Sequence, residues 1–67
     1  MKVKKGQIVH VRHSRKGGFH ARALKEFDTA VDEVFYVSPL TTVRSRTGAE
    51  WHPGEELSLA RALCEIS

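Results

Sequence analysis

Residues 7–27 read QIVHVRHSRKGGFHARALKEF. Within them, residues 7–12 are rich in β-branched side chains that alternate with polar ones, the pattern of a strand with one buried face. Gly17-Gly18 can supply the positive φ that a tight reversal needs, and apolar residues alternate again over residues 19–27. This part of the chain therefore predicts a β-hairpin with a basic turn.

Two further strands are predicted downstream. Residues 33–37, EVFYV, are apolar and aromatic and suit a central strand. Pro39 should end its pairing, because proline has no N–H for the ladder. Residues 41–46, TTVRSR, alternate again, and Thr47-Gly48 should close them as a turn.

The C-terminal segment allows two interpretations. Apolar residues at helical spacing follow Pro53-Gly54-Glu55-Glu56, which is typical of a helix with an acidic first turn. Leu57 and Leu59, however, alternate as in a strand. Because four preceding strands need closure, we favour the strand. The expected elements are a strand over residues 55–60, a 3₁₀ turn near residues 61–63 and a last strand at residues 64–66.

Short strands separated by regular turn signals predict an all-β barrel or sandwich, and the small size favours a barrel of five to six strands. A 67-residue chain buries only about 60% of the surface that its unfolded form exposes, so a deep catalytic cavity is not expected. One domain should occupy residues 1–67. The predicted core consists of Val9, Val11, Phe27, Phe35, Val37, Val43 and Leu57, with Phe19 beside them.

The strand pattern resembles a Src-homology-3-like small barrel, and residues 5–24 resemble the KOW motif of ribosomal and transcription-elongation proteins. That motif combines a lysine, a glycine, alternating valines and a loop with lysine-glycine. The positions that match are Gly6, Val9, Val11, Lys16 and Gly17. Gln7 stands where the motif has an acid. The resemblance implies RNA or protein contact through the loops of a barrel, without enzymatic activity.

Charge is divided unevenly along the chain. The first 25 residues hold eight lysines and arginines and no acid, whereas the remaining 42 residues hold three arginines and all eight acids. The two parts therefore carry formal charges of +8 and −5. Clustered positive charge releases counterions from phosphate backbones and steers association, so this asymmetry predicts a polyanionic partner.

The candidate nucleic-acid-binding residues are the cations of the hairpin and of the predicted fourth strand, together with one aromatic side chain. A phosphate could meet both charged side chains and the bare backbone N–H groups of the glycine turn. Trp51 lies in a predicted loop and could stack on a base, a role for which Tyr36 is a second candidate. The full set is Lys4, Lys5, Arg12, Arg15, Lys16, Arg22, Arg44, Arg46 and Trp51.

Two alternatives would remove this role. The basic turn could be a solvated loop that only keeps the protein soluble. Acids could also fold back beside the cations, and Arg44 and Arg46 could pair across strands with Glu33 or Glu26. The acids that could neutralise the hairpin are Glu26, Asp28, Asp32 and Glu33.

Enzymatic and metal chemistry find no support in the residue pattern. The serines lack a nucleophile-elbow motif, and the chain has no phosphate-binding loop of the GxxxxGK type. His10, His13, His20 and His52 fit no zinc spacing, although His10 and His20 could oppose one another across the hairpin. We expect surface imidazoles, no metal, no cofactor and no catalytic residues.

The compartment and the partner follow from these observations. A single cysteine, Cys64, excludes an intrachain disulfide, and the chain shows no signal peptide or 20-residue apolar run, so a cytoplasmic protein with no membrane contact is expected. Two function classes stay open. One is a barrel that binds RNA or DNA, and the other is an interaction module, such as a small phage-like accessory protein, that binds an acidic protein partner.

Overall fold

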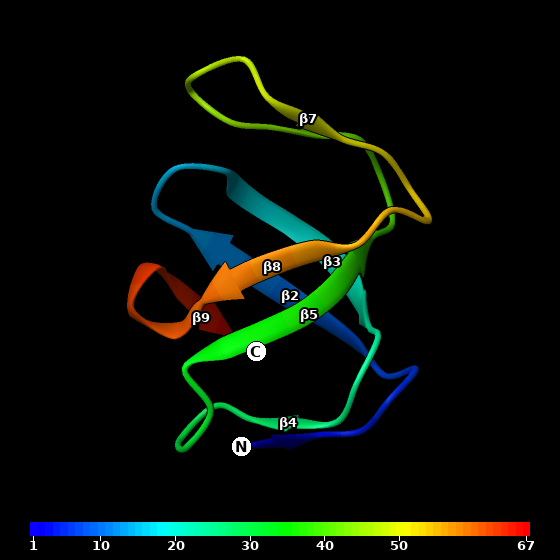
Figure 1. Ribbon diagram of the computed structural model, residues 1–67, viewed down its shortest axis with the longest axis vertical. Helices are drawn as coiled ribbons and strands as arrows, with labels where there is room; N and C mark the ends of the chain where they lie inside the picture. Colours follow the sequence, from blue (N-terminus) through cyan, green and yellow to red (C-terminus); the bar gives the residue numbers. More distant parts are fainter.

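The computed structural model describes all of residues 1–67 as nine strands and one 3₁₀ turn, with no α-helix (Figure 1). The all-β prediction is thereby confirmed. In chain order the elements are β1 (Lys2–Val3), β2 (Ile8–His13), β3 (Gly17–Ala23), β4 (Phe27–Asp28), β5 (Val34–Pro39), β6 (Val43–Arg44), β7 (Glu50–Trp51), β8 (Leu57–Ala60), η1 (Arg61–Leu63) and β9 (Cys64–Ile66).

Five strands form one antiparallel sheet in the order β8-β5-β3-β2-β9. Its centre is the predicted hairpin, in which β2 and β3 pair from Ile8 opposite Arg22 to His13 opposite Gly17. Gly17 has a φ of +75°, which glycine adopts without strain. The hairpin thus holds a continuous six-residue pairing, and β8 and β9 lie at the edges of the sheet.

Two short ribbons lie at opposite ends of this sheet, with β4 at one end and β7 at the other (Figure 1). In one, β1 pairs with β4 through Val3 and Phe27. In the other, β6 pairs with β7 through Val43 and Trp51. At least one of these side chains from each ribbon is buried in the core, although the ribbons lie outside the main sheet.

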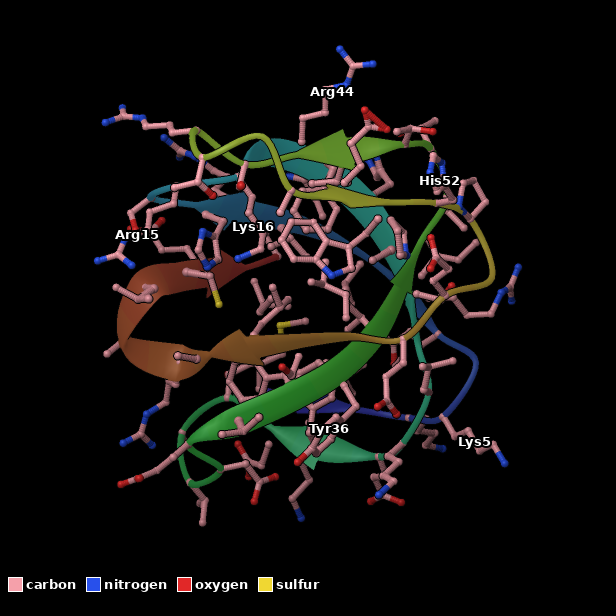
Figure 2. The ribbon with its side chains drawn as sticks, turned by 45° about the horizontal axis from the view of Figure 1, so that its top comes forward. Lys5, Arg15, Lys16, Tyr36, Arg44 and His52 are labelled. Carbon is pink, nitrogen blue, oxygen red and sulfur yellow. The ribbon has the colours of Figure 1, made fainter.

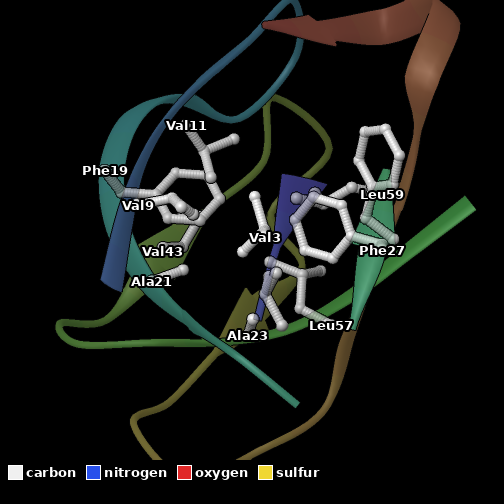
Figure 3. Close-up of a cluster of buried hydrophobic side chains, with 12 residues drawn as sticks. Val3, Val9, Val11, Phe19, Ala21, Ala23, Phe27, Val43, Leu57 and Leu59 are labelled. Carbon is white, nitrogen blue, oxygen red and sulfur yellow. The ribbon is translucent and has the colours of Figure 1, made fainter. Parts of the chain in front are cut away.

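Twelve buried side chains form a single core cluster (Figure 3). Figure 3 shows Val3 in the middle of it, between the side chains of β2 and β3 on one side and those of β4 and β8 on the other. All seven predicted core residues and Phe19 belong to it. The members are Val3, Val9, Val11, Phe19, Ala21, Ala23, Phe27, Phe35, Val37, Val43, Leu57 and Leu59.

Three predicted strands are longer than the real ones, and one of them, over residues 55–60, begins only at Leu57. The second arm of the hairpin ends at Ala23 and not at Phe27, because the chain bends at Leu24 and Lys25 before it reaches β4. The predicted strand over residues 41–46 is a ribbon strand of two residues, Val43 and Arg44. Arg46 therefore lies in a turn and does not share a strand face with Arg44.

The C-terminal segment is a strand, as favoured from the sequence. Leu57 and Leu59 face the core while Ser58 and Ala60 are exposed, and the 3₁₀ turn falls at Arg61–Leu63. The Arg61 backbone N–H donates to the Glu33 carbonyl at 2.8 Å, which ties this turn to the start of β5. The structure has no helix of a length and apolarity suited to crossing a bilayer.

Candidate functional site

The turn between β2 and β3 is organised by a buried histidine. His13 is only 7% exposed, and its Nδ1 accepts hydrogen bonds from the backbone N–H groups of Arg15 at 3.0 Å and Lys16 at 3.2 Å. The expectation of four surface imidazoles is therefore wrong for His13. These two bonds hold the backbone of the turn so that the two cationic side chains extend from it.

The His13 imidazole is held in its neutral form. Burial lowers its pKa, and the charges of Lys16 and Arg15 lower it further. Because Nδ1 accepts two hydrogen bonds, the single ring proton belongs on Nε2. Protonation of Nδ1 would break both bonds to the turn.

Stability should therefore fall on acidification. A histidine whose folded pKa lies below its unfolded value contributes stability above about pH 6.5, and this is lost as the pH falls toward the folded pKa. One proton limits the slope to about 1.4 kcal/mol per pH unit. Urea titrations between pH 7 and pH 5 should show this decline in the free energy of unfolding.

The matched variants are His13→Asn and His20→Asn. An asparagine Oδ1 stands where Nδ1 stood and accepts the same N–H groups without titrating, so the His13→Asn protein should lose the decline. His20 is exposed on the outer face of the sheet, and its replacement should leave the decline unchanged. Equal pH dependence in the wild type and the His13→Asn protein would contradict the role of His13.

The turn between β6 and β7 is a second tight reversal. Ser45 donates its backbone N–H to the Ala49 carbonyl at 2.9 Å, and Gly48, with a φ of +89°, donates to the Ser45 carbonyl at 3.1 Å. The Ser45 and Thr47 hydroxyl oxygens lie 2.8 Å apart. This turn presents two hydroxyl groups and the exposed guanidinium of Arg46.

The two turns meet around a hollow of about 380 Å³. Arg15 and Lys16 line it from the first turn, Arg46 lines it from the second, and Trp51 lines it from β7. The Lys16 ammonium lies 4.8 Å from the centroid of the Trp51 ring. No aspartate or glutamate lines this hollow. We call it the two-turn hollow.

Trp51 is anchored rather than free in a loop. It lies on β7 opposite Val43, is half-buried and packs against the core cluster. Part of its ring surface therefore contributes to stability, and another part borders the two-turn hollow beside Lys16. The prediction that Trp51 lies in a loop is wrong, because Trp51 belongs to β7.

The acids of the C-terminal part do not neutralise the basic turn by pairing. The structure has two ion pairs within 4.0 Å and one contact between His52 and Glu50 that is an ion pair only when the imidazole is protonated, and none of the three includes a lysine or arginine of the first 25 residues. Asp28 pairs with the terminal ammonium, and Glu50 pairs with Arg44 at 3.0 Å and with His52 at 3.7 Å. Arg44 thus has a partner that the sequence did not suggest.

The other predicted cations lie away from the two-turn hollow. Lys4 and Lys5 belong to the segment between β1 and β2, at the far end of the hairpin, where the Gly6 carbonyl accepts a hydrogen bond from Arg22 Nη1 at 3.0 Å. Figure 2 shows Lys5 and Arg15 at opposite sides of the molecule. A six-residue strand separates such ends by roughly 17 Å. Arg12 is exposed on β2, opposite Gly18 and beside β9.

A larger hollow of about 530 Å³ lies between the hairpin and η1. His10, Arg12 and His13 border it on one side, and Cys64 and Glu65 border it on the other. Its charges are mixed, and it has no aromatic platform of the Trp51 kind. Burial raises the pKa of the Cys64 thiol, which keeps it protonated at neutral pH.

The two histidines that were expected to meet across the hairpin do so. His10 lies opposite His20 in the register, with ring centroids 4.8 Å apart. The structure contains no group of three or more histidine, cysteine or acidic side chains that could hold a metal ion.

The sequence contains a signal for the burial of His13, which the expectation of surface imidazoles overlooks. In a strand, residues two apart share a face, and Val9, Val11 and His13 therefore point to the same buried side. No comparable signal exists for Ser45 and Thr47, because they reach the hollow only through the folding of the ribbon.

No protein-family model, no curated protein and no solved structure matches this chain. The geometry and charge of the surface are therefore the features of this protein that bear on its function.

Proposed function

We propose that this protein is a non-enzymatic domain that binds the sugar-phosphate backbone of RNA or DNA at the two-turn hollow. One observation supports this most directly: three cations from two turns about 30 residues apart in sequence converge on a surface that no acid lines. These cations are Arg15, Lys16 and Arg46. Backbone phosphates carry the complementary charge at regular spacing.

The site also offers neutral donors. The Ser45 and Thr47 hydroxyl groups border the same hollow as the three cations. Hydroxyl and arginine side chains are among the groups that commonly contact phosphate oxygens. Since such contacts position a protein without reading bases, we expect weak sequence preference.

A second basic group supports association without sharing the contact surface. Lys4, Lys5 and Arg22 lie at the far end of the hairpin, and none of them is in an ion pair. Their field adds to the attraction of a polyanion at low salt and is screened beyond roughly 10 Å at about 0.1 M salt. The proposal therefore assigns the direct contacts to the two-turn hollow and assigns long-range steering to these residues.

The proposal includes the Src-homology-3-like, KOW-like interpretation of the hairpin and a cytoplasmic location. Gly6 and Gly17 both adopt positive φ, at +88° and +75°, so the two glycines shared with the motif stand where glycine is needed. The five-stranded sheet and the 3₁₀ turn before β9 suit a small barrel of that type. The single cysteine suits a reducing compartment.

A salt titration of binding tests the proposal. With about three phosphate contacts, the logarithm of affinity should fall against the logarithm of salt concentration with a slope of about −2 for a single strand and about −3 for a duplex. Fluorescence anisotropy of labelled oligonucleotides measures this slope. Unrelated sequences should give similar affinities.

Failure to bind any RNA or DNA at low salt, where screening is weakest, would overturn the proposal. An interaction with an acidic protein would then be the better explanation, and the edge strands β8 and β9 offer a place for a partner strand. A pull-down from nuclease-treated and untreated lysate separates the two outcomes, because only nucleic-acid-mediated capture is lost after nuclease treatment.

A further inference from the structure

The Trp51 ring borders the two-turn hollow, and the Lys16 ammonium lies over it. The ring also packs against the core cluster, which fixes it in place. The Lys16 ammonium lies 4.8 Å above the ring centroid, and Lys16 takes part in no ion pair. Because an ammonium group is strongly hydrated, its position shows that this ring face is reached from the solvent side.

We infer that the two-turn hollow accepts one base of a single-stranded nucleic acid, which stacks on Trp51 while the Lys16 ammonium moves from the ring to a neighbouring phosphate. This inference rests on the proposed function and specifies its ligand. A duplex would contact the same cations through its phosphates alone, because its bases are already stacked and paired.

The energetics favour this exchange. Lys16 and Trp51 are both half-buried, and base stacking on an aromatic side chain generally contributes more than a cation–π contact that water can still reach. Lys16 also gains a charged partner when it moves to a phosphate, since it has none in the free protein. Both groups thus exchange a weaker contact for a stronger one.

The dimensions and the rim of the hollow suit one nucleotide. Its volume of about 380 Å³ lies at the lower end of the range of small-ligand sites, which is about 300 to 1,000 Å³. Arg15 and Arg46 border it from separate turns, so phosphates on either side of a stacked base would each meet a guanidinium. A fixed aromatic platform within a basic surface is the general arrangement of sites for single strands.

Trp51 is the only tryptophan of the chain, so its fluorescence reports on this site alone. The wild-type protein is titrated at one salt concentration with three ligands of equal length: oligothymidylate, a fully abasic strand and a duplex. Oligothymidylate should quench Trp51 and bind roughly 5- to 150-fold more tightly than the abasic strand, which corresponds to one stacked base. The duplex should bind without quenching.

Two variants separate stacking from charge, with binding followed by the anisotropy of labelled strands. Trp51→Leu should reduce the preference for oligothymidylate over the abasic strand to less than twofold and leave the salt slope unchanged. Trp51→Phe keeps an aromatic face and the packing on the core, so it should retain part of the preference. Lys16→Met should keep the preference and make the slope shallower by about 0.7, the effect of one lost contact.

The outcomes distinguish the inference from the proposed function. Equal affinities for oligothymidylate and the abasic strand, with no quenching, would overturn the inference and leave backbone binding intact. The absence of binding to all three ligands would overturn both. If Trp51→Leu does not fold, the comparison of the three ligands on the wild-type protein still decides the question.

Discussion

Replacement of both Arg15 and Lys16 by glutamate is expected to weaken nucleic-acid binding by about 25- to 60-fold at about 0.1 M salt. Each lost phosphate contact removes about 0.7 to 0.9 logarithmic units of affinity at that salt, and the introduced acids add repulsion. The salt slope should become shallower by about two contacts, and all sequences should be affected alike. Anisotropy titrations at several salt concentrations measure both quantities.

The fold should survive this change. The turn is held by backbone N–H groups that donate to His13, and these groups are retained when the side chains change. Arg15 is exposed, and Lys16 is half-buried and loses only its cation–π contact with Trp51, so stability should change by about 1 kcal/mol or less. A cooperative melt close to that of the wild type would show that the loss of binding is a surface effect.

In the matched control, glutamate replaces Lys4 and Lys5, which lie at the far end of the hairpin. This variant changes the net charge by the same amount, so it weakens long-range attraction equally. Its salt slope should stay close to that of the wild type, because no contact at the two-turn hollow is lost. Equal losses of slope in the two variants would contradict the assignment of the contacts to Arg15 and Lys16.

Arg44→Glu is expected to have little effect on binding. Arg44 is exposed and paired with Glu50 at 3.0 Å, and it does not border the two-turn hollow. Exposed pairs of this kind contribute about 0 to 1 kcal/mol, so stability should also change little. A loss of affinity as large as that of the double variant would show that the contact surface extends over β6.

Phe35→Ala is expected to remove most of the stability of the protein. Phe35 is 1% exposed, and its ring stacks on that of Phe27 with centroids 4.5 Å apart. Truncation of a buried phenylalanine costs about 3 to 5 kcal/mol, and the whole stability of a domain of this size is about 5 kcal/mol, so about 0 to 2 kcal/mol should remain. Circular dichroism and a thermal melt should show a melting temperature far below that of the wild type.

Val31→Ala is the control for this loss, since Val31 is 70% exposed. Removing these exposed apolar atoms leaves no cavity, so the melting temperature of the Val31→Ala protein should match that of the wild type. The melting temperature of Phe35→Leu should lie between those of Phe35→Ala and Val31→Ala, because leucine retains most of the buried volume. A cooperative melt of Phe35→Ala at the wild-type temperature would show that Phe35 does not stabilise the core.

The hairpin and the core could be predicted because their signals are local. Val9 and Val11 alternate with polar residues, and this period of two assigns them to one face without knowledge of the rest of the chain. Leu57 and Leu59 decided the C-terminal strand in the same way. The ribbons of β1 with β4 and of β6 with β7 were harder to predict, because two residues are too few to show a period.

The sequence pointed to the charged and aromatic residues of the two-turn hollow, but not to its hydroxyl groups or its arrangement. The sequence alone identified Arg15, Lys16, Arg46 and Trp51 as candidates from residue type and charge. No feature of the sequence separated these four residues from Lys5, which lies on the opposite side of the molecule from Arg15 (Figure 2). That separation is a consequence of strand length and of where each turn falls along the sheet.

The sequence by itself determined the all-β class, the buried faces of the strands and the basic character of the hairpin, because alternation and net charge are properties of neighbouring residues. Only the tertiary structure decided that Glu50 pairs with Arg44, that His13 holds the basic turn and that Lys16 meets Trp51. These contacts depend on the direction in which two short turns leave the sheet. That direction is set by the packing of the whole core, so no local pattern encodes it.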